Sequence, residues 1–404
     1  MIRNFDRLEF FSILWALAYI LYLVQFSLAF ATPLKILTLL SAMMVVITPN
    51  FIIVFLLFII LQTADILNQL PYIGEHLFLV LFVDLVIVFA FIAQNPWKGR
   101  THFERKKFLN EFSLVVCTGF LIFYFFTALA KLNSDFLSYK VSCGAQHYLR
   151  LAKKFPVLSS AAWAQSAAIY GTILMEWTLP LLLLFSPTRT AGVVLGILFH
   201  FLIGINSFEK IGFQSFSSTL FALFLLFLPR DSDEPPVKTL RRGMAPSVIL
   251  LIWVVVNGLC PYLGLKTAGV FTMHSNLRTE GGTSNHLFIP TFLQIFKFQR
   301  DLVFIADSSD PFLRKHAKQR NLLPYFVLRS YISQAAQRGE KNIEVTFVRE
   351  GKTRILNNAE KDPELSKPYP FLLRKWMFFR AVRSERDLPA ECNDRVGWDE
   401  FLIF

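Results

Sequence analysis

The sequence predicts an all-α polytopic membrane protein of about nine transmembrane helices, followed by a small soluble α+β part. The first reason is composition: 54% of the 404 residues are hydrophobic and 44 are Phe. The mean hydropathy is +0.47. Soluble domains hold only about 45–50% apolar residues. The second reason is a series of apolar segments near the ~20 residues that cross a hydrocarbon core.

The expected helices follow one another with short polar loops between them. They lie near residues 8–30, 34–48, 50–67, 77–95, 111–131, 160–185, 190–206, 213–229 and 246–264. The first is a helix rather than a cleavable signal, because its apolar run exceeds the roughly 7–15 residues of a signal core. The second and third are separated by Thr48-Pro49-Asn50, so a helical hairpin and one kinked span both stay open.

The loops predict the orientation. Lys and Arg accumulate in residues 95–107 and 230–242, and such short basic loops face the cytoplasm. Nine helices with a cytoplasmic amino terminus place both loops inside and the carboxyl terminus outside. We therefore expect an integral membrane protein, with a bacterial inner membrane as its setting. The net charge of +12 follows from this topology and from anionic lipid headgroups. Nucleic acid is not an expected partner, since no aromatic-studded basic groove accompanies the charge.

The chain changes character after residue 265. Apolar runs shorten, and residues 342–356 alternate like two strands joined at Glu350-Gly351. The expected domains are therefore 1–265, in the membrane, and 266–404, an extracytoplasmic α+β appendage. The four cysteines lie far apart and form neither zinc-ligand nor thioredoxin spacing. Whether Cys143 and Cys260 pair is left open.

Ionisable groups within the apolar segments are the first candidates for function, because each costs about 2.5–3.5 kcal/mol at a helix centre on insertion scales. Near a predicted helix end, Asp65 is expected to be solvated. Asp84 lies mid-span, where helix–helix hydrogen bonding is the simplest role. Glu176 precedes Pro180 by four residues and is expected to have a buried polar partner.

Lys131 ends an apolar segment in FTALAKLNSDFLS and allows two interpretations. A lysine at a helix end can extend its ammonium into the headgroup layer at little cost. A buried lysine can instead lose its proton and act as a base. Similarly, His200 is either a hydrogen-bonded packing residue or a functional one.

The last expected helix is followed by the segment from His274 to His286, which with Met273 before it reads MHSNLRTEGGTSNH. It brings His274 and His286 to the outer face, and Gly281-Gly282 permits a tight turn. This segment is interpreted either as a lid above the helices or as an elbow between domains.

Three segments together resemble the horizontally transferred transmembrane (HTTM) family, which includes vitamin K-dependent gamma-carboxylase. They are FTALAKLNSDFLS, ILFHFLIGINSFEKIGFQSF and VFTMHSNLRTEGG, in the family's order and rough spacing, within residues 1–290. The resemblance implies that Lys131 is the base that deprotonates a reduced quinone. It also matches His200 and His274 to family histidines, with Asn206 and Ser207 following the first, and implies nine helices.

The implied activity uses a quinol of the vitamin K or menaquinone type and dioxygen to drive carboxylation. His200 and His274 would stabilise oxyanions, Asn206 and Glu176 are assigned to cofactor binding, and no metal is expected. The expected partners are the lipid bilayer and a peptide or protein substrate. The appendage of about 140 residues is shorter than the carboxylase's lumenal part. A non-catalytic assembly protein or a peptide- or toxin-maturation protein is therefore the alternative. A transporter would need a polar path past Glu176 and Asp84.

Overall fold

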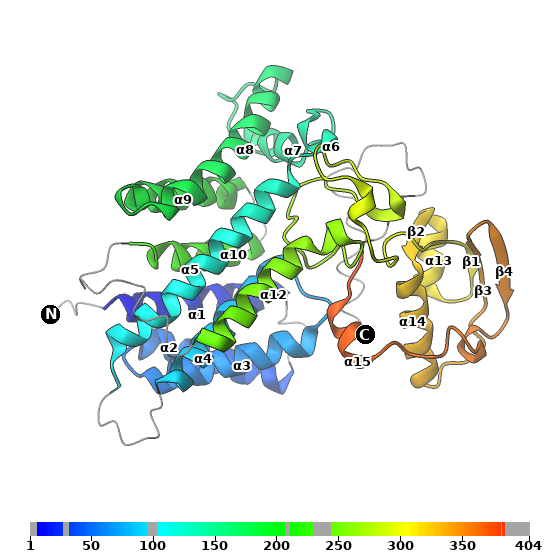
Figure 1. Cartoon of the computed structure of the whole chain (residues 1–404), viewed down its shortest axis with the longest axis horizontal. Helices are drawn as coiled ribbons and strands as arrows, with labels where there is room; N and C mark the ends of the chain where they lie inside the picture. The colour runs from blue at the N-terminus through cyan, green and yellow to red at the C-terminus, as the bar shows by residue number, and fades with distance from the viewer. Residues whose placement is uncertain are drawn as a thin grey trace.

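The fold places a group of long helices beside a small sheet (Figure 1). A computed structural model describes residues 6–26, 32–94, 103–206, 211–228, 244–380 and 382–383. Within these residues the chain is mostly helical, and its strands form a small antiparallel sheet in the carboxyl-terminal region. The predicted combination of a helical part and an α+β part is therefore confirmed in this coarse form.

A helix lies at each of the nine expected positions. They are α1 (Arg7–Phe26), α2 (Pro33–Ile47), α3 (Ile52–Gln69), α4 (Glu75–Ala93), α5 (Arg105–Ala130), α8 (Ala162–Leu184), α9 (Arg189–Asn206), α10 (Ile211–Leu225) and α12 (Met244–Leu263). Among the described residues, seven helices are long and apolar enough to cross a membrane. The shorter α2 and α10 have 15 residues each.

The uncertainty at Thr48-Pro49-Asn50 is resolved as a hairpin. Helix α2 ends at Ile47, α3 begins at Ile52, and the two helices pack against each other. The Thr48 hydroxyl and its backbone N–H both donate to the Met44 carbonyl, so that Thr48, the residue before the proline, caps α2.

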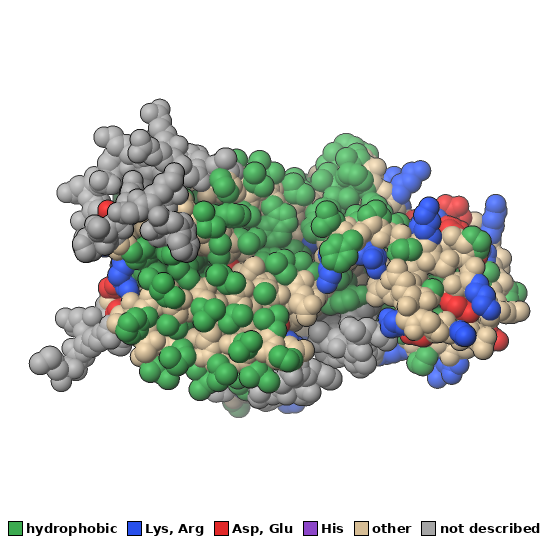
Figure 2. All heavy atoms as spheres, turned by 90° about the horizontal axis from the view of Figure 1, so that it is seen from below, with side chains coloured by type: hydrophobic (Ala, Val, Ile, Leu, Met, Phe, Trp, Pro, Cys, Tyr) green, Lys and Arg blue, Asp and Glu red, His purple; other side chains and the backbone are tan. Residues whose placement is uncertain are grey.

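The helical part buries many large aromatic side chains and exposes a wide apolar surface. Figure 2 shows apolar side chains over the helices and charged ones gathered mainly over the sheet. Helix α5 crosses the interior, and Gly119 brings it against Phe82 of α4 because a Cβ there would overlap that ring. Likewise, Gly258 lets α12 approach α5 closely, because a Cβ at Gly258 would overlap the Phe126 ring. An apolar outer surface of this kind suggests a membrane protein.

Five strands form the carboxyl-terminal sheet in the order β4-β3-β1-β2-β5. Their bounds are β1 (Leu302–Ser308), β2 (Asn321–Pro324), β3 (Val345–Arg349), β4 (Lys352–Leu356) and β5 (Val382–Arg383). The expected hairpin is confirmed: Arg349 pairs with Lys352, and Glu350 and Gly351 have φ of 51° and 76°. Positive φ at both central residues is the geometry that suits a two-residue hairpin.

Helices α13 (Pro311–Lys318), α14 (Tyr325–Gln337) and α15 (Phe371–Trp376) complete this part. A separate apolar cluster joins it to the helices, with Cys260 and Leu265 on one side and Phe326, Met377 and Phe379 on the other. The junction also contains a buried ion pair, because Arg380 Nη2 lies 3.2 Å from Glu280 Oε1.

One expectation is corrected, and one open question is answered. Asp65 is not solvated: it is 1% exposed and accepts hydrogen bonds from Tyr19 Oη and Gln69 Nε2 at 2.5 and 2.8 Å. Tyr19 of α1 supplies the hydrogen bond that water would have supplied to a carboxylate exposed at the helix end. Cys143 and Cys260 do not pair, since Cys260 is a free, buried thiol, whereas Cys143 is disulfide-bonded.

Lys266, just beyond α12, is a buried lysine at this junction. Its burial makes the stability of the folded protein depend on pH. Lys266 is 1% exposed, and burial lowers its pKa to about 7. Its ammonium lies 4.0 Å from the Phe78 ring centroid and 5.3 Å from that of Trp376. Both rings favour the cation and offset part of the burial penalty.

We predict that Lys266→Met removes part of the rise in thermal stability on going from pH 7 to pH 10. The unfolded chain binds the lysine proton more tightly than the folded one, so stability is gained as pH rises from about 7 to the unfolded value of 10.5. The measurement is the melting temperature of the detergent-purified protein across this range. Exposed Lys341→Met is the control, and equal pH profiles for all three proteins would contradict the prediction.

Candidate functional site

Lys131 lies inside the protein. It caps the carboxyl end of α5 and is 4% exposed. Its Nζ lies 2.9 Å from Glu176 Oε2 and donates to the carbonyl oxygens of Met273 and Thr127 at 3.2 and 3.4 Å. A lysine that extended into headgroups would be exposed, so the anchoring interpretation does not describe this geometry.

Asn133 fixes the chain around Lys131. Its Oδ1 accepts the backbone N–H of Phe136 at 2.8 Å and so caps α6 (Ser134–Leu137). Its Nδ2 donates to the carbonyls of Ala130 and Ser275 at 2.8 and 2.6 Å. The second bond holds residues 273–275 beside the end of α5, which brings the Met273 carbonyl within reach of the lysine.

Glu176 comes from α8, which continues through Pro180. Proline has no backbone N–H, so the Glu176 carbonyl lacks the usual donor four residues ahead. Lys131 is the buried polar partner that the sequence led us to expect for Glu176. The assignment of Glu176 to cofactor binding stays a prediction, although Glu176 lines the same cavity as the lysine.

A cavity of about 370 Å³ lies between α5, α7 (Cys143–Lys154), α8, α9 and α10. Lys131, Glu176, His200 and His274 all line it. Most of the other lining side chains are apolar or aromatic, among them Phe123, Phe136, Leu151, Met175, Phe199, Ile203, Phe216, Leu220 and Met273. This volume is typical of small-molecule pockets, which span roughly 300–1,000 Å³. The fold thus brings polar residues from four segments that are distant in the sequence to one apolar chamber.

His200 is buried on α9 and forms a hydrogen bond with Tyr124 through Nε2 and the phenol oxygen. Its Nδ1 is buried and has no hydrogen-bond partner within the described part of the chain. Tyr124, Thr127 and Lys131 are spaced i, i+3 and i+7, so they share one face of α5. That spacing was the signal that could have identified Tyr124 from the sequence.

His274 has a backbone φ of 49°, and its ring lies 4.8 Å, centroid to centroid, from that of His147. His147 belongs to α7, a helix that the sequence analysis did not predict. No sequence motif marked His147, because its position in the site depends on how α7 packs against residues 273–274.

The segment that follows His274 is built as an elbow. Residues 277–280 are mostly buried, and Arg380 donates to the Leu277 carbonyl at 2.7 Å while pairing with Glu280. His286 Nδ1 accepts the N–H groups of Phe288 and Ile289, and Nε2 lies 3.0 Å from the Leu129 carbonyl. This pattern requires a neutral ring with its proton on Nε2. Burial also lowers the pKa of His286.

The remaining sequence candidates are not among the described lining of the cavity. Asn206 is the last residue of α9, with its side chain outside the described structure, and Ser207 lies outside the described residues. Asp84 does not line the cavity; its Oδ1 accepts a hydrogen bond from Trp15 Nε1 at 2.9 Å. The polar path past Glu176 and Asp84 that a transporter would need is therefore not seen among the described residues. They also contain no cluster of His, Cys, Asp or Glu that could hold a metal.

Comparisons with known proteins give no family, because no family model, curated protein or solved structure matches the chain. What the site can do must be argued from its groups. An amine, a carboxylate, a phenol and imidazoles around an apolar space can move a proton to or from an apolar ligand that carries oxygen.

We predict that Asn133→Ala lowers stability by roughly 2–4 kcal/mol. The substitution removes a helix cap, worth about 1 kcal/mol, and leaves buried backbone groups without partners at about 1–3 kcal/mol. Thermal melting of the purified protein measures the change. Asn357→Ala, at an exposed position, is the control and should melt like the unsubstituted protein; an equally small effect of Asn133→Ala would show that the cap is dispensable.

Proposed function

We propose that the protein is an integral membrane protein of the HTTM type that binds a reduced isoprenoid quinone in the cavity and uses Lys131 as the base. The observation that supports this most is that the buried Lys131 lines one apolar chamber together with Glu176, His200 and His274. In this proposal α2 and α10 complete nine crossings of a bacterial inner membrane. The amino terminus is cytoplasmic, and the sheet is extracytoplasmic.

The cavity suits such a ligand by its chemistry. Its aromatic and aliphatic lining would accept a prenylated ring and exclude water, while the few polar groups would orient the oxygen atoms. A reduced quinone bound there would supply, with dioxygen, the strong base that drives carboxylation of a carbon in a peptide or protein substrate.

Lys131 and Glu176 would act as a pair. An ion pair in a dry, low-dielectric space is costly unless its geometry is good and additional hydrogen bonds satisfy its remaining atoms. When a ligand displaces water, transfer of one proton from the Lys131 ammonium to the Glu176 carboxylate gives two neutral groups. The neutral amine then can accept a proton from a hydroxyl of the ligand.

The two histidines would hold the negative charge that results. His200 has an unoccupied Nδ1 among the described residues, and its Nε2 is bonded to Tyr124. If the Tyr124 hydroxyl donates to Nε2, Nδ1 carries the ring proton and can donate to an oxyanion. His274 lines the cavity beside Met273, whose carbonyl holds the lysine.

The second candidate function is a non-catalytic assembly or peptide-maturation role, and one observation favours it. The Lys131 ammonium already has a carboxylate and two carbonyls around it. A buried charge whose partners are complete can serve structure alone. In this role the cavity would hold a lipid or a segment of a partner peptide.

Quinol epoxidation separates these functions. The protein, reconstituted in lipid with reduced menaquinone and dioxygen, is expected to form epoxide without any peptide substrate. Lys131→Ala should reduce the rate by about 10²–10⁴-fold, the usual contribution of a positioned base. Glu176→Gln should also slow it, since the amide cannot take the lysine proton.

Lys153→Ala, on an exposed position of α7, is the matched control and should retain the rate. An unsubstituted protein that is folded and supplied with quinol but makes no epoxide would overturn the catalytic proposal in favour of the assembly role.

A further inference from the structure

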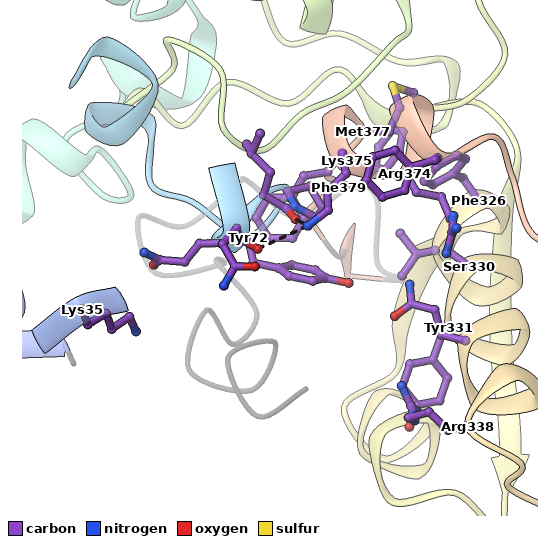
Figure 3. A pocket seen from close by; sticks show the side chains of 18 residues that line it. Lys35, Tyr72, Phe326, Ser330, Tyr331, Arg338, Arg374, Lys375, Met377 and Phe379 are labelled. Atoms are coloured by element: carbon purple, nitrogen blue, oxygen red, sulfur yellow. Dashed lines mark hydrogen bonds between the residues drawn. The ribbon is translucent and has the colours of Figure 1, made fainter. Parts of the chain in front are cut away.

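A second cavity, of about 380 Å³, lies between the end of α3, helix α14 and helix α15 (Figure 3). Its described lining includes four cations and neither Asp nor Glu; the cations are Lys35, Arg338, Arg374 and Lys375. Arg338 also forms an ion pair with Glu340, Nε to Oε1 at 2.6 Å, so the excess positive charge rests mainly on the other three. Figure 3 shows Lys35 at the left, Arg374 and Lys375 of α15 at the upper right and Arg338 at the lower right. Such an excess of one charge in a hollow attracts an ion of the opposite charge.

Hydrogen-bond donors in this cavity are unused. Arg374 Nε and Ser330 Oγ are buried and have no hydrogen-bond partner among the described residues. Buried polar atoms normally have partners, so two orphans lining one cavity indicate a ligand that accepts hydrogen bonds. An oxyanion offers acceptors to both, and arginine binds phosphate oxygens especially well.

Lys375 adds fixed positive charge at the same place. Its Nζ donates to the carbonyls of Asn68 and Leu70 at 3.2 and 3.0 Å, which ties α15 to the end of α3. Burial and then the nearby charge of Arg374 lower the pKa of Lys375. A bound anion would relieve both costs, because it attracts the two cations that otherwise repel each other.

The position of the cavity identifies the source of the anion. It opens where α3, one of the membrane-length helices, ends. Three apolar side chains close in sequence to the lining residues Lys35 and Asn68 are exposed on α2 and α3, namely Ile36, Leu40 and Leu67. On α15, Phe371 and Leu372 are 63% and 79% exposed. Apolar surface beside a basic hollow matches a molecule with acyl chains and an anionic headgroup.

We propose that this cavity is a binding site for the phosphate of an anionic phospholipid, with Arg374 and Ser330 as its hydrogen-bond donors. The site would fasten the sheet domain to the bilayer surface through α15. It rests on the proposed membrane placement but is independent of the chemistry of the Lys131 cavity.

The test counts bound lipid by native mass spectrometry of the full chain in detergent. The probes are dioleoyl phosphatidylglycerol, dioleoyl phosphatidylcholine and inorganic phosphate. The unsubstituted protein is expected to retain phosphatidylglycerol in preference to phosphatidylcholine. Arg374→Gln together with Ser330→Ala should weaken phosphatidylglycerol binding by roughly ten-fold or more, since a hydrogen bond to a charged group is worth that factor.

Three comparisons make the result specific. Lys341→Gln removes one exposed charge that is not part of the described cavity lining and should bind lipid like the unsubstituted protein. Arg374→Lys keeps the charge but loses the Nε donor, so intermediate binding is expected. Lys131→Ala should leave phosphatidylglycerol binding intact, which separates failure of this site from failure of the proposed catalytic function.

Two outcomes would overturn the proposal. Equal retention of phosphatidylglycerol by the unsubstituted protein and the Arg374→Gln, Ser330→Ala variant would place the lipid elsewhere. Displacement of the lipid by millimolar inorganic phosphate, with equal affinity for phosphate alone, would make this a site for a soluble phosphate rather than a lipid.

Discussion

The contact between Lys131 and Glu176 is the interaction on which the organisation of the site depends. It joins α5 to α8 inside an apolar layer, where either charge alone would cost several kcal/mol. The Met273 carbonyl accepts a hydrogen bond from Lys131 of this pair. Asn133 in turn fixes the segment that contains Met273, because it donates to the Ser275 carbonyl. The short α6 and the chain after α12 are therefore arranged around one buried ammonium.

Two other buried carboxylates of the helical part, those of Asp84 and Asp65, have separate, local partners. Trp15 donates to Asp84 between α1 and α4, and Tyr19 donates to Asp65 between α1 and α3. These bonds connect neighbouring helices and leave no shared polar space with the cavity. Within the described residues, an amine, a carboxylate and imidazoles therefore line one apolar cavity together around Lys131. This separation is what favours a chemical role for that cavity over a general role in packing.

Local patterns were enough to predict much of the fold. Each apolar run became a helix within a few residues of its expected bounds, because length and hydrophobicity leave a chain in a bilayer few other choices. The turn at Glu350-Gly351 followed from local φ preferences. By contrast, α7 was missed because its short, amphipathic sequence forms a helix by packing against α8 and α9.

The site was predictable only in part, for a related reason. Lys131, His200, His274 and Glu176 were noticeable because ionisable groups are expensive in apolar segments. The sequence spacing of these four residues could not show which of them lie close together in the fold, because they are up to about 140 residues apart. Asp65 was judged by its distance from a helix end, whereas its burial depends on Tyr19 of another helix. The orphan donors at Arg374 and Ser330 likewise arise from the meeting of α14 and α15.

The central claim is that a ligand entering the cavity moves a proton from Lys131 to Glu176. Infrared difference spectroscopy of the reconstituted protein, before and after addition of menaquinol, tests this most directly. The account predicts loss of a carboxylate band and gain of a protonated-carboxyl band, both absent in Glu176→Gln. A Glu176 carboxylate that stays ionised while menaquinol is bound would contradict it and leave the ion pair with a structural role.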